Sequence, residues 1–452
     1  MEDQQEPQAG ADQSGTPARK HVFLEWYLVL VLGLVNALSQ ADRAGLNLIV
    51  NPLKRDLGVS DTQISLLIGL SFIVLFTVLS VPAGYLADIL NRRKLLGGAV
   101  VLWSAMVTLC GFAKNYWQLF AGRMGLGVGE SPVAPASYSL IGDGVGPARR
   151  VRAFAAYNAM GVIGTSLGTL AGGAVYGAAE HGMLAGVPVL ADLKPWQLVL
   201  VIPGLFGFLL AALLLTISEP KRRDVAGSDR ASYIEALRYT LLHRRRYLPI
   251  FASFVLVCLA SGGWHAWIAA AIGRSWQLSP AVIGRTAGSI GLLLSPLPAF
   301  LLAYVMDIFK SRGHNAAPPL VAAVVCAANG ASALLVLLAP TVWSMWMGYG
   351  VWCVLSYTVV GNVCGMMLVE ITPSHLVGKV ASIYFLCAYF LGATPGPTLF
   401  ALVAQYGFRG PSAISQAILV CYPLVIVLTI AALLAAALEI GRYKARLNAV
   451  PK

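Results

Sequence analysis

Apolar stretches long enough to cross a lipid bilayer recur twelve times along this chain, and they limit its fold more than any other feature. A bilayer core of about 30 Å needs about 20 helical residues, and lipid cannot satisfy free backbone groups, so each stretch must be helical. The expected spans are 23–48, 62–86, 95–113, 116–141, 153–178, 196–217, 247–272, 280–307, 318–339, 341–370, 379–405 and 413–438. The sequence therefore predicts an all-α integral membrane protein with twelve transmembrane helices.

The composition agrees with a multi-pass membrane protein and excludes an ordinary soluble one. Of the 452 residues, 58% are hydrophobic and only 12% are charged, and the mean hydropathy is +0.73. A soluble protein usually carries about 25% charged residues. The seven cysteines lie in apolar segments without a CxxC pair or a His cluster. We therefore expect no disulfide, no metal site and no cofactor.

Lys and Arg are distributed unevenly between the two sides of the predicted membrane. With the N-terminus in the cytoplasm, 23 of the 32 basic residues fall in cytoplasmic segments, 6 in outside loops and 3 within spans. This asymmetry follows the positive-inside rule and predicts cytoplasmic N- and C-termini. Anionic lipid at the inner surface also explains the net charge of +12, so we expect no nucleic acid partner. The absence of any N-x-S/T sequon favours a bacterial inner membrane as the location.

One long hydrophilic segment, residues 219–246, divides the spans six and six. Its second part, SYIEALRYTLLHRRR, has the apolar spacing of an amphipathic helix lying on the membrane surface. We therefore expect five parts: a disordered cytoplasmic tail over 1–20, helical bundles over 21–218 and 247–440, a cytoplasmic linker over 219–246 and a second tail over 441–452.

The two halves resemble each other when Ser60 is aligned with Ser279 without gaps. Identical residues then coincide at Ser60/Ser279, Ile64/Ile283, Gly69/Gly288, Tyr85/Tyr304, Asp88/Asp307, Ile89/Ile308 and Arg93/Arg312. A duplicated unit predicts two pseudo-symmetric six-helix bundles with a binding site between them, which is one major transporter architecture.

The stretch GYLADILNRRK follows the second span and resembles the G-x-x-x-D-x-x-x-R-R/K signature of the major facilitator superfamily. In that family the motif braces cytoplasmic helix ends and stabilises the outward-open state. The resemblance implies a cytoplasmic gate formed by Gly84, Asp88, Arg92, Arg93 and Lys94, with Asp307 and Glu370 as braces of the second half. We expect Asp88 to pair with Arg92 or Arg93, or to cap a neighbouring helix end. A topology signal is the alternative explanation of the basic cluster.

The fourth span, YWQLFAGRMGLGVGESPVAPASYSLIGD, has the family's R-x-x-x-G pattern through Arg123 and Gly127, and it also contains Glu130. Together with QADRAG in the first span and the long linker, it resembles the spinster branch of the superfamily. That branch is associated with sphingosine-1-phosphate, lysophospholipids and similar amphipathic lipids, with proton coupling proposed.

Four charged residues lie within the first and fourth spans: Asp42, Arg43, Arg123 and Glu130. An ionised group at mid-membrane costs about 2.5–3.5 kcal/mol on insertion scales, so such groups face a partner or a wet cavity. The first span runs outward and the fourth inward, which places Arg123 at a depth similar to Arg43 and Glu130 about 10 Å deeper. The four could therefore meet. Adjacent residues on a helix point about 100° apart, so we expect either Asp42 or Arg43, but not both equally, to face the cavity.

We interpret these charges as a proton and anion relay. Asp42 and Glu130 are the expected proton carriers, and Arg43 and Arg123 can bind a phosphate through paired hydrogen bonds. A static neutral network that only holds the bundle together is the alternative.

The second half lacks a matching set of buried charges and offers aromatic residues instead. The expected substrate cavity has one charged wall and one aromatic wall, formed by Arg43, Arg123, Glu130, Trp264, His265, Tyr349, Trp352 and Tyr384. Such a cavity suits an amphipath with a polar head and a long tail. For each aromatic residue, packing in the core or against lipid is the alternative.

The sequence thus predicts a monomeric, proton-coupled secondary transporter that works by alternating access. Its expected partners are a lipid-like small molecule, protons and membrane lipids. A carrier of small organic anions or sugars is the alternative within transport. A membrane enzyme or a lipid-sensing receptor is the alternative of another class. The chain shows no metal cluster, nucleophile elbow or cofactor loop, and no sizeable soluble output domain, so we expect neither.

Overall fold

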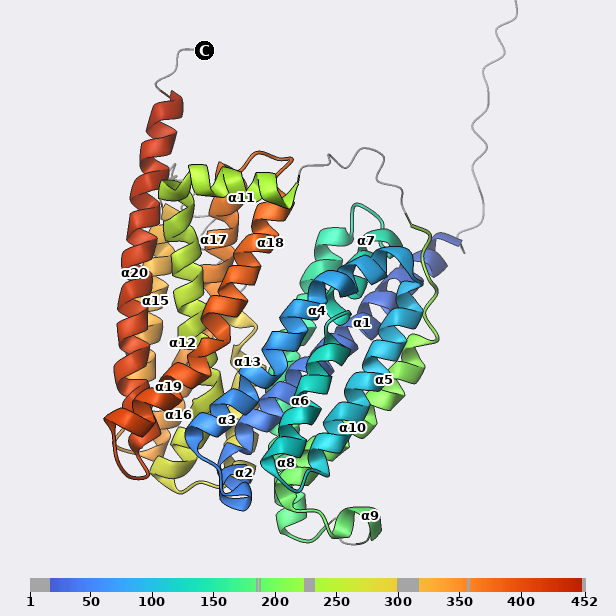
Figure 1. Cartoon of the computed structure of the whole chain (residues 1–452), viewed down its shortest axis with the longest axis vertical. Coiled ribbons are helices and arrows are strands. Elements are labelled where there is room, and N and C mark those ends of the chain that lie inside the picture. The colour runs from blue at the N-terminus through green and yellow to red at the C-terminus, as the bar shows by residue number, and fades with distance from the viewer. Residues whose placement is uncertain are drawn as a thin grey trace, which may run out of the picture.

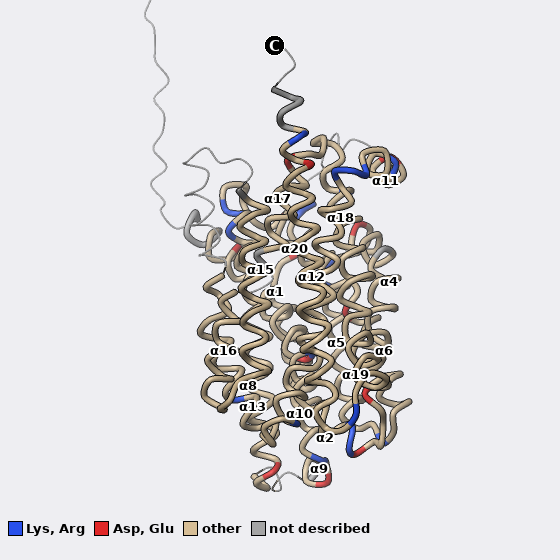
Figure 2. The backbone as a smooth tube through the Cα atoms, turned by 90° about the vertical axis from the view of Figure 1, so that its left-hand side faces the viewer, with Lys and Arg blue, Asp and Glu red and all other residues tan. Residues whose placement is uncertain are grey.

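The computed structural model describes residues 17–183, 186, 188–222, 232–298, 317–355 and 358–448, and every regular element within them is a helix. Nine of these helices are long and apolar enough to cross a membrane, and two shorter apolar ones span Pro280–Leu294 and Val360–Ile371. Charged residues gather at the two ends of the molecule, with few between them (Figure 2). The predicted all-α membrane fold is confirmed.

Two helical bundles stand side by side (Figure 1). The first contains α1 (Pro17–Leu48), α2 (Val50–Leu57), α3 (Asp61–Ile68), α4 (Leu70–Ile89), α5 (Arg92–Gly111), α6 (Tyr116–Glu130), α7 (Val133–Gly144), α8 (Arg150–Glu180), α9 (Pro188–Ala191) and α10 (Pro195–Leu214). The helix α11 (Tyr233–Leu242) lies in the linker.

The second bundle contains α12 (Arg244–Trp276), α13 (Pro280–Leu294), α15 (Ala317–Leu337), α16 (Val342–Val354), α17 (Thr358–Ile371), α18 (Val377–Cys387), the π-helical turn η1 (Ala388–Ala393), α19 (Pro395–Gly407) and α20 (Ala413–Asn448). Described helices occupy each of the twelve predicted spans, although the eighth span is described only to residue 298. Helix α1 begins within the segment predicted as the first tail, and α20 continues into the segment predicted as the second.

Several predicted spans are broken in the middle. The break in the fourth span follows Glu130, where Pro132 cannot donate a backbone hydrogen bond. The carbonyl oxygen of Val128 accepts a bond of 2.9 Å from the Ser131 hydroxyl instead. The chain thus ends α6 at a buried carboxylate, that of Glu130, and begins α7 three residues later at Val133. Hydropathy gives no signal for such a break, because both sides of it are equally apolar.

The second and eleventh spans are broken where they touch. Gly69 separates α3 from α4, and η1 separates α18 from α19. A Cβ atom at Gly69 would lie only 2.9 Å from the carbonyl oxygen of Thr394, so the contact requires glycine. The Thr394 N–H donates to the carbonyl of Tyr389, five residues earlier, which is the π-helical pattern.

Among the described residues, the two bundles are sealed together at one end only. We call the end that carries α11 the linker end and the end that carries α2 and α9 the far end (Figure 1). The buried core of the second half continues into far-end residues of the first half, including Leu46, Ile49, Leu53 and Ile64. Helix α8 packs directly on α13, since a Cβ atom at Gly173 would lie 2.7 Å from the Cα atom of Gly284. Toward the linker end, the bundles diverge (Figure 1).

Candidate functional site

Asp42 lies on α1 and faces α5 inside the first bundle. Its side chain is buried, and its Oδ2 atom accepts a hydrogen bond of 2.8 Å from Nε1 of Trp103. Its other oxygen, Oδ1, is buried and has no hydrogen-bond partner among the described residues. Trp103 is itself fully buried. The indole therefore holds one carboxyl oxygen and leaves the second available to a proton.

Arg43, the next residue, points toward α6. Its guanidinium forms an ion pair with Oε2 of Glu130 and stacks over the ring of Phe72, at 4.5 Å from the ring centre. The Arg43 side chain is 34% exposed and that of Glu130 is 1% exposed, so the pair joins an accessible cation to a buried anion. The second oxygen of Glu130, Oε1, is buried without a hydrogen-bond partner in the described structure. This site also offers room for a proton.

Arg123, on α6, is buried and has neither a hydrogen bond nor an ion pair within 4 Å to any described residue. Its guanidinium carbon lies 5.5 Å from the ring centre of Phe72. The same ring therefore lies beside two arginines, and cation–π attraction stabilises both. A buried guanidinium without a hydrogen-bonded carboxylate is costly, and the Coulombic attraction of Glu130 and Asp42 offsets part of that cost.

These four charged residues form one cluster, which we call the charge cluster. Asp42 interacts electrostatically with Glu130, Arg123 and Arg43, and Arg123 interacts with the other three. Side chains from the two spans predicted to meet do meet, and they contribute two acids and two bases. Arg43 reaches the partner on α6 while Asp42 turns toward Trp103, so adjacent residues serve different partners, as their 100° separation requires.

The aromatic residues predicted for the second wall lie mostly in the packed interior of the second bundle. Trp264, Trp352 and Tyr384 are at most 5% exposed. Trp264 stacks on Trp352 at 4.9 Å between ring centres, and Tyr384 stacks on Phe254 at 4.5 Å. In this structure these three are core residues rather than lining residues, because the rings bury more apolar area against one another than a cavity wall would.

His265 and Tyr349 are the two predicted wall residues that remain partly accessible. The His265 ring meets Trp352 edge-on at 5.4 Å, and its Nδ1 atom lies 2.9 Å from the carbonyl oxygen of Ser261. Tyr349 stacks on Trp352 at 6.0 Å. Their role as a substrate wall stays a prediction.

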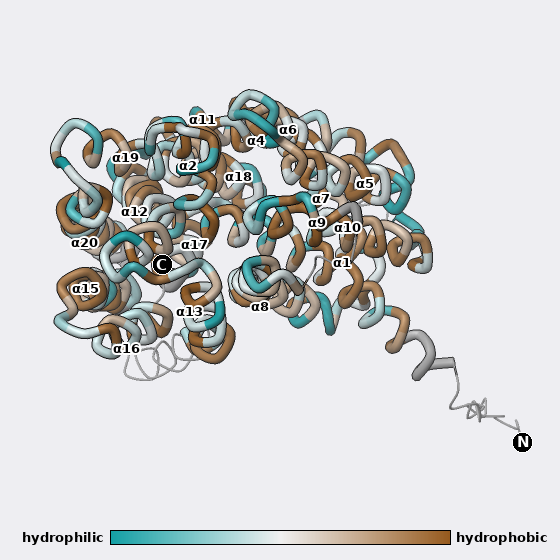
Figure 3. Tube along the Cα trace, turned by 90° about the horizontal axis from the view of Figure 1, so that it is seen from below, coloured by the Kyte–Doolittle hydropathy of each residue, from teal (hydrophilic) through white to brown (hydrophobic). Residues whose placement is uncertain are grey.

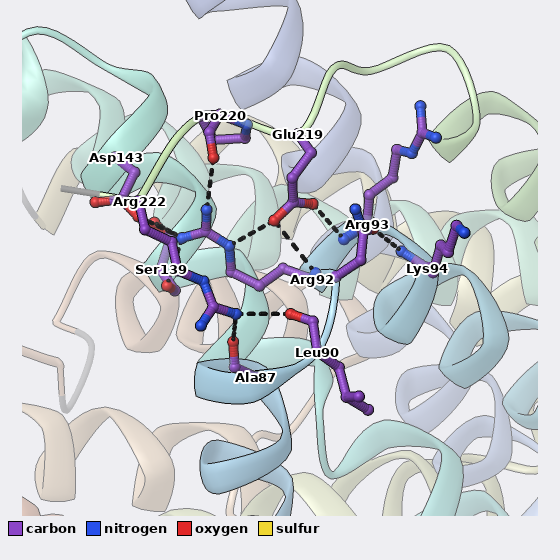
Figure 4. Close-up of polar contacts among 11 residues, drawn as sticks. Ala87, Leu90, Arg92, Arg93, Lys94, Ser139, Asp143, Glu219, Pro220 and Arg222 are labelled. Atoms are coloured by element: carbon purple, nitrogen blue, oxygen red, sulfur yellow. Dashed lines mark hydrogen bonds and ion pairs between the residues drawn. The ribbon is translucent and has the colours of Figure 1, made fainter. Parts of the chain in front are cut away.

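Arg92, in the predicted gate motif, is buried at the linker end and binds two carboxylates (Figure 4). It forms ion pairs with Asp143 on α7 and, at 2.8 Å, with Glu219 of the linker. It also donates to the Ser139 hydroxyl at 2.9 Å and to the carbonyl oxygen of Pro220 at 2.8 Å. The motif thus fastens three segments of the first bundle together.

The expected pairing of Asp88 with Arg92 or Arg93 is wrong for this structure. Asp88 is exposed, while Arg93 donates to the carbonyl oxygen of Ile217 at 3.0 Å. Glu219 takes the place assigned to Asp88, because its two oxygens also accept the backbone N–H groups at the start of α5. An acidic residue at a helix N-terminus is favoured by the helix dipole.

The other predicted gate residues have simpler surroundings. Lys94 is exposed, and its backbone N–H donates to the capping residue Asn91 at 2.9 Å. A Cβ atom at Gly84 would meet no other atom within 4 Å. Glu370 is exposed near the end of α17. Asp307 lies outside the described residues.

Two polar contacts at the linker end were not predicted. Arg222 of the linker donates to the carbonyl oxygens of Ala87 and Leu90, which closes the C-terminal end of α4 (Figure 4). Arg149 binds both oxygens of Glu25 at 2.7 and 3.0 Å, and this hydrogen bonding raises the pKa of the Arg149 guanidinium above its ordinary value. The partners are more than 120 residues apart in sequence, so no local motif could have signalled them.

A second unpredicted set, at the far end, joins the two bundles. Arg274 on α12 donates to both oxygens of Asp61, at 2.9 and 2.7 Å, and to Oδ1 of Asn51 at 2.8 Å. Lys54 also pairs with Asp61 at 2.8 Å, and the amide of Asn51 donates to the carbonyl oxygen of Ala270. These contacts hold the far end closed, and they must break before it can open.

Comparison of the sequence and the fold with known proteins identifies relatives of this chain. The sequence profile of the Major Facilitator Superfamily matches residues 32–397. The chain belongs to this superfamily of transporters. It is 25% identical over 272 residues to an MFS-type efflux pump of Mycolicibacterium smegmatis, covering 59% of this chain and 60% of that protein.

Relatives of the spinster type recur in the comparisons. The chain is 24% identical over 306 residues to Protein spinster of Drosophila melanogaster, covering 64% of this chain and 47% of that protein. It is 27% identical over 246 residues to the sphingosine-1-phosphate transporter SPNS2 of Danio rerio, covering 53% and 46%. The matches thus span about half to three-fifths of these relatives' own lengths.

A solved structure agrees with the fold over nearly the whole chain. It is a bacterial homolog of the human lysosomal transporter Spinster, in an inward-facing and unoccupied conformation, with a TM-score of 0.76 and 20% identity. The match covers 94% of this chain and 96% of that one. The predicted major facilitator fold and the resemblance to the spinster branch are both confirmed.

Proposed function

We propose that this transporter carries an amphipathic, lipid-like anion of the sphingosine-1-phosphate or lysophospholipid type, and that protons drive it by alternating access. The observation that carries the proposal is the charge cluster. Asp42 and Glu130 each keep one buried oxygen without a hydrogen bond, while Arg123 is buried without a hydrogen bond or an ion pair within 4 Å among the described residues. One site therefore offers places for protons and a place for an anion.

The ion pair between Arg43 and Glu130 supplies the coupling step. A proton that adds to Glu130 removes its negative charge and so ends the attraction to Arg43. The guanidinium of Arg43, already partly exposed, then binds the anionic head group with Arg123. Release of the head group and loss of the proton restore the ion pair. Each state keeps the charges in the apolar interior balanced, which is the condition for burying them.

The closed far end supports the proposal that this structure is inward-facing. With the positive-inside rule, the linker end is cytoplasmic and the structure is inward-facing. The Arg274 contacts with Asp61 and Asn51 then act as an outer gate, and the Arg92 motif holds the inner ends of the first bundle. The expected wall residues His265 and Tyr349 face the tail of the substrate from the second bundle.

Uptake by purified protein in liposomes tests the substrate class. We expect a sphingoid phosphate or lysophospholipid to be accumulated when a pH gradient is imposed, and Arg43→Ala to abolish the accumulation. Arg149→Gln is the matched control, because it breaks another arginine–carboxylate pair of the same bundle outside the charge cluster. Normal accumulation by the Arg43→Ala protein would overturn the relay.

Competition separates the lipid substrate from the alternatives. Inhibition of uptake by dicarboxylates or sugars, with none by lysolipids, would assign a carrier of small polar solutes instead. Binding of lysolipid without any flux would assign a lipid-sensing receptor. A thermal-shift screen of the solubilised protein against these ligand classes gives the same ranking without transport, because a ligand raises the melting temperature according to its affinity.

A further inference from the structure

The linker helix α11 crosses the linker end of the second bundle, over the tops of the spanning helices (Figure 1). Seen along the helix axis in Figure 2, it stands at the edge of the molecule and carries Glu235 and Arg238. One side of α11 packs on the protein: Ala236 is fully buried and Tyr239 is half-buried, with its ring edge-on to Tyr247 at 6.1 Å.

The apolar side of α11 is not the side that packs on the protein. Tyr233, Ile234, Leu237 and Leu241 are 60%, 77%, 46% and 61% exposed. At 3.6 residues per turn these four side chains fall within about 100° of one another, so they form one continuous stripe. A globular packing function would bury that stripe. The stripe is exposed on a helix that lies at the membrane boundary. This exposure indicates that the stripe contacts an apolar environment outside the protein.

Basic residues border this stripe. Arg238 lies next to it on the helix surface, and Arg244 and Arg245 follow in the first turn of α12. All three are exposed. Arg246 is different, because its guanidinium stacks over the ring of Tyr443 at 4.0 Å and is held by the protein.

The acidic residue of α11 does not cancel this charge. Glu235 lies on the other side of the helix from the stripe, and its carboxylate is 4.0 Å from the ring of His375. The surface formed by the stripe and the three arginines, which we call the α11 surface, therefore combines exposed apolar side chains with adjoining positive charges. Amphipathic helices that bind membrane surfaces combine these two properties.

We propose that the α11 surface binds anionic phospholipid of the adjoining leaflet, with the stripe among the acyl chains and the three arginines on the phosphates. Charge complementarity selects anionic over zwitterionic lipid, because each arginine near an anionic surface contributes attraction that zwitterionic lipid lacks. Bound lipid anchors the second bundle at the end where the bundles separate. The inference is independent of the transported substrate.

A fluorescent reporter on the stripe tests the proposal directly. The variant Ile234→Cys is labelled with a nitrobenzoxadiazole group. Cys387→Ser is introduced as well, because Cys387 is partly accessible to the label while the other six native cysteines are buried. We expect phosphatidylglycerol, titrated into the detergent-solubilised full-length protein, to shift the emission to the blue at far lower concentration than phosphatidylcholine. The triple variant Arg238→Gln/Arg244→Gln/Arg245→Gln should weaken phosphatidylglycerol binding by about fivefold per arginine and leave phosphatidylcholine unaffected.

The matched control removes three exposed basic residues from the far end, as Arg55→Gln/Lys114→Gln/Arg409→Gln. It should keep the lipid preference. The proposal is overturned if the α11 triple variant retains the preference, if the far-end control loses it, or if the reporter stays in a watery environment with both lipids. A second pair of changes, Leu237→Ser/Leu241→Ser, should weaken binding of both lipids alike, because it removes the apolar contribution and keeps the charges.

Discussion

Each half of this molecule buries a tryptophan that donates its indole N–H, but the two acceptors differ in kind. In the first half, Trp103 donates to the carboxylate of Asp42 at 2.8 Å. In the second half, Trp352 donates to the hydroxyl of Tyr422 at 3.1 Å. The first interior is built around charges and the second around neutral groups. Under the proposed function, the two halves divide two tasks between them, proton exchange in the first and apolar contact in the second.

In the second half, the network around Trp352 is hydrogen-bonded, although the buried Nε1 atom of Trp264 and the Tyr384 hydroxyl have no hydrogen-bond partner among the described residues. The Tyr422 hydroxyl donates to Oδ1 of Asn329 at 2.6 Å, and the Asn329 amide donates to the carbonyl oxygen of Leu355 at 2.9 Å, where α16 has ended. The charge cluster, by contrast, retains buried oxygens without donors on Asp42 and Glu130. Satisfied networks rigidify a bundle, whereas unsatisfied charges leave room for chemistry.

The largest effect is expected when the exchangeable proton of the charge cluster is removed. Glu130→Gln cannot take up or lose a proton, so accumulation driven by a pH gradient should fall about 100-fold, which corresponds to about 2.7 kcal/mol. Exchange of substrate without a gradient should fall far less. Flux assays in liposomes with and without the gradient measure both. Preserved gradient-driven accumulation would place proton coupling elsewhere.

The same substitution in both tryptophans compares the two acceptors directly. Trp103→Phe should lower the free energy of unfolding by about 3 kcal/mol, and Trp352→Phe by about 1.5 kcal/mol. Hydrogen bonds to a charged acceptor contribute about 1.5–3 kcal/mol and neutral ones about 0.5–1.5, while the lost ring volume is the same in both. Equal losses, measured by denaturant unfolding in micelles, would indicate that Asp42 carries its proton in the resting state.

Tyr422→Phe removes one hydroxyl from the neutral interior and keeps the ring. The change leaves Oδ1 of Asn329 without this donor, so we expect a loss of about 1 kcal/mol in unfolding free energy. The pH dependence of transport should stay that of the wild type. A changed pH profile would show that the second half also takes part in proton exchange, and the division of tasks would be wrong.

The smallest effect is expected at the exposed acid of the repeated motif. Asp88→Asn should change the unfolding free energy by less than about 0.5 kcal/mol, since Asp88 is exposed and the Arg92 contacts do not involve it. Arg92→Gln provides the contrast, because it leaves the carboxylates of Asp143 and Glu219 without their shared cation. A melting temperature for Asp88→Asn as low as that of Arg92→Gln would contradict the observed pairing.

The fold could be predicted because its largest physical requirement, burial in lipid, acts on segment length and hydropathy alone. The twelve spans and the six-plus-six division follow from that requirement. The breaks in α3–α4 and α6–α7 could not be predicted in the same way. They depend on the tertiary contact of Gly69 with Thr394 and on the hydroxyl of Ser131 replacing a backbone donor.

The charge cluster was predictable because charges are rare within membrane spans and must meet there. Which partner each would take was not, because side-chain direction depends on helix rotation. Arg43 forms an ion pair with Glu130, whereas Asp42 accepts a hydrogen bond from the Trp103 indole. An indole is uncharged, so it does not stand out in the sequence as a partner for a buried carboxylate. The partners of Arg92 and Arg274 were not predicted for a related reason. Glu219 and Asp61 lie in segments that the sequence places outside the membrane, and they come close to these arginines only when the helices assemble.

The contact between Gly69 and Thr394 has a mechanical consequence. It joins two broken helices at one point, with the segments α4 and α18 extending from that point toward the linker end. A 20-residue helix such as α4 is about 30 Å long, so a tilt of about 10° at its base moves its tip by about 5 Å. If the touching backbones act as a pivot, a small rearrangement at Gly69 and Thr394 is amplified into a displacement of several ångströms at the linker end.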